Sequence, residues 1–175
     1  MWKIQKLGLG LLLVFAVVAH ADPKMTVSTT AADKKGNFPV LYTCDGKDVS
    51  PEISWQNAPA NTATFALTIT DPDAPGGLFY HWILYNMPKE TNHLDQGTEK
   101  LPVGTLEAAN TWGKHHYQGP CPPKGSTHRY VISVYALNKP FDLGMDVDGD
   151  TLDLSLHGHV LQKAMYTVTY TRMGS

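Results

Sequence analysis

Four segments rich in β-branched and aromatic residues constrain the fold of this chain more than any other feature. In the segment 64–70, apolar residues recur at every second position, which is the period of a half-buried strand. The segments 79–87 and 129–137 are almost continuously apolar or aromatic, and 166–170 alternates tyrosine or valine with threonine. The connections between these segments are rich in proline and glycine. This pattern predicts a single, mainly β domain.

One helix is also predicted, in the last third of the chain. Thr151 is expected to cap its N-terminus, and the spacing of Leu152 and Leu156, continued by Val160 and Ala164, is that of one helical face. A mainly β chain with so little helix is most simply built as two packed sheets. We therefore predict a β-sandwich with one or two short helices.

The first 21 residues predict a secretory signal peptide. Two lysines precede an unbroken apolar run over residues 7–19, and the tripeptide Ala-His-Ala at 19–21 is a small-residue cleavage site. The run is shorter than the roughly 20 apolar residues that span a membrane. We expect cleavage after residue 21, a mature domain of residues 22–175, a periplasmic or secreted location and no stable membrane span. The alternative is a buried N-terminal helix or an uncleaved anchor.

Composition and charge exclude several classes of protein. With 175 residues, 42% of them hydrophobic and 17% charged, the chain is in the globular range and not the disordered one. The formal net charge is −2, and it becomes −4 when the two leader lysines are removed. A nucleic-acid binder needs a basic stripe, whereas the only arginines here are Arg129 and Arg172, far apart in sequence. We therefore expect no nucleic-acid partner.

The chain has two cysteines, Cys44 and Cys121, and both lie in loop sequence rich in glycine or proline. An even number of cysteines in an exported chain favours a disulfide between them. Closing a loop of this length would contribute about 4 kcal/mol on the chain-entropy description. Two unrelated thiols are the alternative.

Two stiff loops deliver polar groups to the ends of predicted strands. The first, over residues 71–77, contains two aspartates and two prolines and is followed by His81 at the start of the next strand. The second, over residues 119–127, leads into His128 and Tyr130, which are two residues apart and so share one face of a strand. Such loops can form a small concave site. A histidine beside a tryptophan, as at position 81, is otherwise an ordinary core residue.

These segments resemble the phosphatidylethanolamine-binding protein family, in its bacterial Raf-kinase-inhibitor-like branch, over essentially the whole mature chain. The block 38–55, the loop 71–75 with the following histidine and tryptophan, the segment 119–130 and the closing segment 158–172 are each similar to a family signature. The resemblance implies a Greek-key β-sandwich with a small anion pocket at one end. Kinase regulation is a role of mammalian members and is not carried over.

The resemblance also implies a set of ligand-binding residues. They are Asp71, Asp73, Pro75, His81, Cys121, Pro122, Pro123, His128 and Tyr130. Two imidazoles that are partly protonated near neutrality, with one carboxylate, suit a small monoanion such as phosphate. In phosphoethanolamine, the ammonium group would meet Asp73, Trp82 or Tyr80. His116 stands where bacterial members usually carry glycine, so its effect on the pocket mouth stays open.

We therefore expect an exported, non-enzymatic protein that binds a small anion or phospholipid headgroup and uses no cofactor. One alternative is an inhibitor or regulator of an exported protease or other enzyme, with a protein partner at the loop 119–125. A second is a weak phosphoesterase, in which Asp71 and His81 act on water. The sequence contains no G-x-S-x-G or P-loop motif.

Two further motifs resemble metal sites without completing one. The acidic run 146–150 begins like a calcium loop, but Thr151 and His157 occupy the positions that need glycine and a bidentate glutamate. The histidine pairs at 115–116 and 157–159 have no companion cysteine or glutamate motif for zinc. We predict no metal site.

Overall fold

The computed structural model describes residues 23–144 and 146–174. The predicted signal peptide lies outside these residues, so it stays a prediction. Within them, no helix is both long and apolar enough to cross a membrane.

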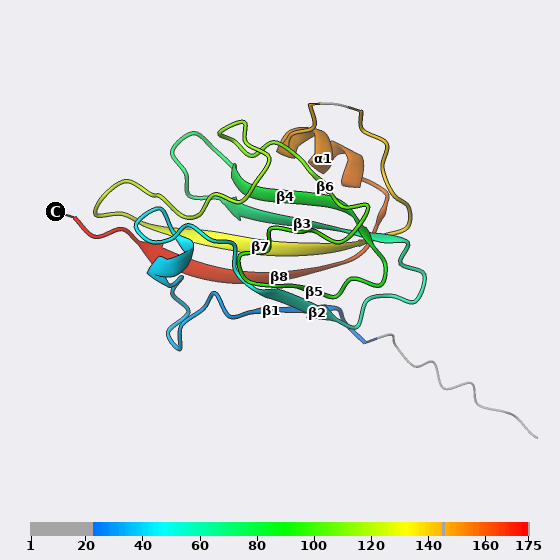
Figure 1. The fold of residues 1–175 in the computed structure, drawn as a ribbon, viewed down its shortest axis with the longest axis horizontal. Helices are drawn as coiled ribbons and strands as arrows, with labels where there is room; N and C mark the ends of the chain where they lie inside the picture. The colour runs from blue at the N-terminus through cyan, green and yellow to red at the C-terminus, as the bar shows by residue number, and fades with distance from the viewer. Residues whose placement is uncertain (1–22, 145, 175) are drawn as a thin grey trace, which may run out of the picture.

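Two antiparallel sheets make up most of the molecule (Figure 1). The smaller sheet has the strand order β1-β2-β5, and the larger has the order β6-β4-β3-β7-β8. The elements are β1 (Thr26–Thr29), the 3-10 helix η1 (Val40–Tyr42), β2 (Ile53–Gln56), β3 (Thr64–Asp71), β4 (Phe79–Pro88), β5 (His93–Leu94), β6 (Leu106–Glu107), β7 (Thr127–Leu137), α1 (Gly149–Leu156) and β8 (Val160–Thr171). The prediction of a mainly β, two-layered fold is confirmed.

Strand β3 lies at the centre of the larger sheet, and all eight of its residues are buried. Its alternate residues Phe65, Leu67 and Ile69 belong to the core between the two sheets, where they meet Ile53 and Trp55 of β2. This alternation is the one the sequence predicted for a strand with an apolar face. The opposite face of the larger sheet packs against α1 and the chain before it, in a second apolar cluster.

The helix is shorter than predicted and begins earlier. Asp148, and not Thr151, is the N-cap residue, because its carboxylate accepts a hydrogen bond from the Thr151 backbone N–H at 2.8 Å. The helix ends at Leu156, and Gly158 follows with a φ of +76°, a backbone conformation that favours glycine. Val160 and Ala164 belong to strand β8, so the expectation that they continue the helix was wrong.

Strand β4 contains a β-bulge at His81. Ile69 of β3 pairs with Trp82, but the next residue, Thr70, pairs with Tyr80, which leaves His81 as the extra residue. Trp82 consequently belongs to the core between the sheets, and Tyr80 to the cluster under α1. His81 therefore has no partner residue in β3 and does not follow the regular alternation of side chains between the two faces of the sheet.

Candidate functional site

The central strands β3, β4 and β7 bring their polar residues to one end of the sheet. Because these neighbours are antiparallel, the last residue of β3, Asp71, lies beside the beginnings of β4 and β7. A cavity of about 220 Å³ opens there. Its lining residues are Asp71, Ala74, Pro75, Phe79, His81, Trp112, Cys121, Pro122, Pro123 and His128. Two loops and three strand ends therefore form one small hollow.

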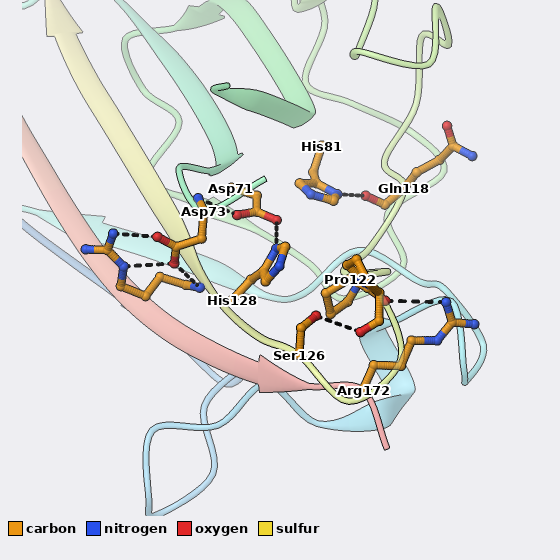
Figure 2. Close-up of polar contacts among 10 residues, drawn as sticks. Asp71, Asp73, His81, Gln118, Pro122, Ser126, His128 and Arg172 are labelled. Atoms are coloured by element: carbon orange, nitrogen blue, oxygen red, sulfur yellow. Dashed lines mark hydrogen bonds and ion pairs between the residues drawn. The ribbon is translucent and has the colours of Figure 1, made fainter. Parts of the chain in front are cut away.

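Asp71 and His128 form a buried pair in this cavity (Figure 2). The Asp71 Oδ2 atom lies 2.6 Å from the Nδ1 atom of His128, and the two side chains are 5% and 9% exposed. The other oxygen, Oδ1, accepts a hydrogen bond from the Asp73 backbone N–H at 2.8 Å. The carboxylate therefore fixes both the turn that follows β3 and the orientation of the His128 ring.

His81 is held by a different acceptor. Its Nδ1 atom lies 2.7 Å from the backbone carbonyl oxygen of Gln118 (Figure 2). A carbonyl oxygen can only accept, so Nδ1 of His81 carries the proton. Burial lowers the pKa of His81 below its usual value of 6.5, and the Gln118 carbonyl offsets this effect only in part. At a given pH, this ring is therefore protonated to a smaller extent in the ligand-free protein than a free imidazole is.

Both imidazoles therefore use Nδ1 for a contact within the protein. The partner is a carboxylate for His128 and a backbone carbonyl for His81. In each ring, Nε2 remains as the nitrogen that a molecule in the cavity can meet. Two rings fixed in this way can offer two hydrogen bonds to one small ligand.

The wall opposite the strand ends is the loop that contains Cys121. A disulfide joins Cys121 to Cys44, whose Cα atoms are 5.4 Å apart, so the predicted pairing is confirmed in the structure. The Cys44 backbone N–H also donates to the Pro120 carbonyl at 3.1 Å. Nearby, a Cβ atom at Gly119 would lie 1.9 Å from the Tyr42 carbonyl oxygen, so only glycine fits this approach. The loop is thereby pinned against the segment around η1.

Two aromatic side chains at the cavity were not predicted from the sequence. Trp112 packs edge-on against Phe79, with ring centroids 4.5 Å apart, and its indole lies 5.3 Å from the His81 ring. Trp112 is 43% exposed, so part of its ring faces solvent at the mouth. The signal available in the sequence was a large aromatic residue within a polar segment. The loop is positioned by a hydrogen bond from the Thr111 backbone N–H to the Tyr80 carbonyl.

Several residues expected at the site lie elsewhere. Asp73 points away from the cavity and receives three hydrogen bonds from Arg129, which lower the pKa of its carboxyl to about 2. Tyr130 does not line the cavity, because it is fully buried behind His81, with ring centroids 5.3 Å apart. Trp82 and Tyr80 are not cavity residues either. The three residues that were expected to contact the ammonium group of a ligand therefore do not line this cavity.

His116 does not narrow the mouth of this cavity. It lines a different, more open hollow of about 530 Å³ together with Trp82 and Tyr117. Among the described residues, no group of three or more histidine, cysteine, aspartate or glutamate side chains is arranged to hold a metal ion. The Asp148 carboxylate of the calcium-like run is occupied with capping α1.

This sandwich, with its polar cavity at the end of the central strands, matches the fold of a known class. A profile of the family described as phosphatidylethanolamine-binding protein matches residues 28–171, and the chain belongs to this family. The crystal structure of Escherichia coli YbcL, described as a new member of the mammalian PEBP family, superposes with a TM-score of 0.79. That chain is 27% identical, and the match covers 85% of the present chain and 99% of YbcL.

Sequence relatives come from archaea and bacteria. A UPF0098 protein of Methanothermobacter thermautotrophicus is 36% identical over 151 residues, which is 85% of this chain and 99% of the relative. The UPF0098 protein YbhB of Escherichia coli is 37% identical over 133 residues, covering 73% of this chain and 84% of the relative. A putative lipoprotein LppC of Mycobacterium tuberculosis is 37% identical over 120 residues, covering 68% of this chain and 58% of LppC.

The lowered pKa of His81 predicts how stability depends on pH. In the unfolded chain the imidazole of His81 binds a proton near pH 6.5, whereas in the folded protein it does so only at lower pH. The unfolded state therefore gains protons first as pH falls, so the free energy of unfolding is highest above about pH 6.5 and decreases below it. Between pH 7.5 and 5.5, the ligand-free protein should lose more unfolding free energy than the His81→Gln variant. Each unit of pKa difference corresponds to about 1.4 kcal/mol. Urea unfolding at both pH values measures this, and equal losses would contradict the expectation.

Proposed function

We propose that this protein is an exported binding protein for a small phosphate-bearing anion, either inorganic phosphate or a phospholipid headgroup such as phosphoethanolamine. The observation that carries the proposal is the pair of imidazoles, His81 and His128, which line one small cavity with Nδ1 engaged and Nε2 left for a ligand. Oriented hydrogen-bond donors and acceptors in a small hollow are typical of ligand sites.

The protonation state of the His81 ring decides which hydrogen bonds it makes to an anion. Neutral His81 accepts a hydrogen bond at Nε2 from a protonated phosphate oxygen. After taking up a proton, the same Nε2 donates to an unprotonated oxygen, and the bond is then charge-assisted. Both arrangements are favoured by a lower pH. Binding is therefore coupled to proton uptake, and affinity increases as the solution becomes more acidic.

The size and walls of the cavity favour a headgroup over a whole lipid. Its volume of about 220 Å³ is below the roughly 300 Å³ at which sites for drug-sized ligands begin. An ammonium group has the partly exposed ring of Trp112 available at the mouth, in place of the residues expected from the sequence. Acyl chains would remain outside the cavity.

Export is part of the proposal. The Cys44–Cys121 disulfide supports it, because disulfides persist in oxidising compartments such as the periplasm and are rare in the cytosol. The basic, apolar and small-residue segments at the N-terminus support it independently. The test is the N-terminal sequence of the protein isolated from a cell fraction. A mature chain that begins at Asp22 is expected, whereas an intact N-terminus in the cytosol would contradict export.

Thermal shift measurements with phosphate and phosphoethanolamine at pH 6 and pH 8 test the binding itself. A ligand at about 100 times its dissociation constant adds roughly 2.7 kcal/mol of stability, which is readily visible. We expect the larger shift at pH 6, and its loss in the His81→Ala, His128→Ala double variant.

The His116→Ala variant is the matched control, because His116 faces a different hollow and its removal should leave the shift unchanged. A shift that survives the loss of both cavity histidines would overturn the assignment of the site. Acetate, run in parallel, separates phosphate recognition from general binding of anions. Inorganic phosphate and phosphoethanolamine, compared at equal concentration, distinguish a free anion from a headgroup.

A second candidate function, regulation of an exported enzyme through the cavity rim, is favoured by the exposed Trp112. Large aromatic residues often dominate the binding energy of protein interfaces, and this one stands at the mouth of the cavity. A partner captured from a periplasmic extract by the wild-type protein should be lost in Trp112→Ala and displaced by saturating phosphate. A chromogenic phosphate ester added to the same protein tests the phosphoesterase alternative, since turnover abolished by His81→Ala would replace binding with catalysis.

A further inference from the structure

A second cavity lies on the other face of the larger sheet, beneath helix α1. Its volume is about 240 Å³. Thr68 and Thr70 of β3 and Ser133 of β7 line it on the sheet side, and Leu152 and Leu156 of α1 line it on the helix side. None of its lining residues belongs to the anion cavity. It is therefore a separate hollow with its own chemistry.

The sheet side of this cavity is made of hydroxyl groups. Thr68 of β3 stands directly opposite Ser133 of β7 in the antiparallel register, and Thr70 is two residues further along the same face. The three residues are only 4%, 2% and 8% exposed, respectively. The other face of the same stretch of β3 carries Leu67 and Ile69 in the main core. Over this stretch, both faces of β3 are buried, but one face carries polar residues and the other carries apolar ones.

Burying these hydroxyl groups is costly unless they find hydrogen-bond partners. Moving a hydroxyl out of water without a compensating hydrogen bond costs roughly 1–3 kcal/mol by mutational data. Valine has the shape of threonine without the hydroxyl, and apolar residues would pack under Leu152 and Leu156 at no such cost. Features that reduce stability in this way are typical of binding sites. The hydroxyl-bearing residues on the sheet side of this cavity therefore favour a molecule that enters it and exchanges hydrogen bonds with them.

The charges at the edge of the cavity restrict that molecule. Asp153 and Lys163 line it, and both are exposed. The Lys163 ammonium lies 4.7 Å from the ring centroid of Tyr135, which also borders the cavity. One negative and one positive side chain among the lining residues leave the wall of the cavity itself without net charge. Hydroxyl groups likewise suit an uncharged polar group, because they both donate and accept.

We propose that this cavity binds a small uncharged molecule with one or two hydroxyl or amide groups on an apolar body. The polar groups meet Thr68, Thr70 and Ser133, and the apolar body packs against Leu152 and Leu156. A cavity of about 150 Å³ is enough to hold benzene, so 240 Å³ accommodates a ring with one or two polar substituents. The site is independent of the phosphate proposal, since the two cavities share no residue.

The probe for the test is cyclohexane-1,2-diol, titrated into isotopically labelled full-length protein and followed by NMR. We expect saturable shifts confined to signals of residues around the cavity, such as Thr68, Leu152 and Leu156. In Thr68→Val the affinity should fall at least tenfold, while the unliganded variant should be as stable as the wild type or more so. The matched control is Thr26→Val, an exposed threonine in strand β1 of the smaller sheet, which should bind the probe unchanged.

Three outcomes would overturn the proposal. One is the absence of saturable shifts at the cavity, in which case the hydroxyls bind only water. Another is unchanged affinity in both Thr68→Val and Ser133→Ala, which would show that the hydroxyls do not recognise the probe. The third is loss of stability in the unliganded Thr68→Val protein, which would show that the hydroxyl already has a partner within the fold. Phosphate, titrated as a second probe, should shift signals at His81 and His128 only.

Discussion

Replacing Asp71 with alanine should lower the free energy of unfolding by about 3–5 kcal/mol, because it removes one partner of a buried, hydrogen-bonded pair. The His128 ring would lose the acceptor of its Nδ1–H, and the Asp73 backbone N–H would lose its own acceptor. Phosphate binding should be lost as well, since nothing would then orient the His128 ring. Urea unfolding and the phosphate thermal shift measure the two effects.

Two further variants separate the possible causes. Asp71→Asn keeps an oxygen that can accept from Nδ1 and nearly the same shape, so it should lose much less stability than alanine. Asp73→Ala removes an exposed ion pair with Arg129 and should have a far smaller effect, because exposed pairs contribute little. If Asp71→Ala unfolds no more easily than Asp73→Ala, the buried pair does not stabilise the fold.

Removing the disulfide is expected to have an effect of similar size. The double variant Cys44→Ala, Cys121→Ala should lose about 4 kcal/mol of stability, because the bond closes a loop spanning 77 positions. Phosphate should also bind more weakly, since Cys121 and the adjacent prolines form one wall of the cavity. The two histidines lie on strands and should keep their places, so binding should be reduced and not abolished.

The experiment compares the double variant with wild-type protein treated with a reductant. Both half-cystines are exposed, so a reductant can reach the bond without unfolding the chain. The two samples should melt at the same temperature, well below the oxidised protein. Equal melting temperatures for all three samples would show that the backbone hydrogen bonds around Cys44 and Pro120 hold the loop without the disulfide.

The long strands were predictable because their patterns are local. Phe65, Leu67 and Ile69 alternate within one segment, which predicts one buried face of β3. Its other face is buried as well, because α1 and the chain before it cover that side of the sheet, and the segment alone does not reveal this. The helix was less predictable, because both Asp148 and Thr151 are suitable N-cap residues. Asp148 prevails through a single hydrogen bond to the Thr151 backbone, and the positive φ at Gly158 ends a pattern that Val160 and Ala164 otherwise continue.

The candidate site was predictable where it depends on loops next to strand ends. Asp71, His81 and His128 follow or begin strands, so the sheet order alone places them at one cavity. Trp112 was missed because its loop reaches the cavity through contacts with residues more than 30 positions away. The position of Asp73 depends on Arg129, a pairing between distant segments that no local pattern reveals.

The bulge at His81 has a consequence for how this protein can change. Because one extra residue separates Tyr80 from Trp82, the same short stretch faces the cavity beneath α1, the cavity of His81 and His128, and the main core in turn. Deleting His81 would restore regular pleating and leave Tyr80 opposite Thr70 and Trp82 opposite Ile69, so only the cavity would lose its side chain. The imidazole at the end of the sheet is thus an insertion on a regular strand pair, and a one-residue deletion would remove it while the pairs on either side persist.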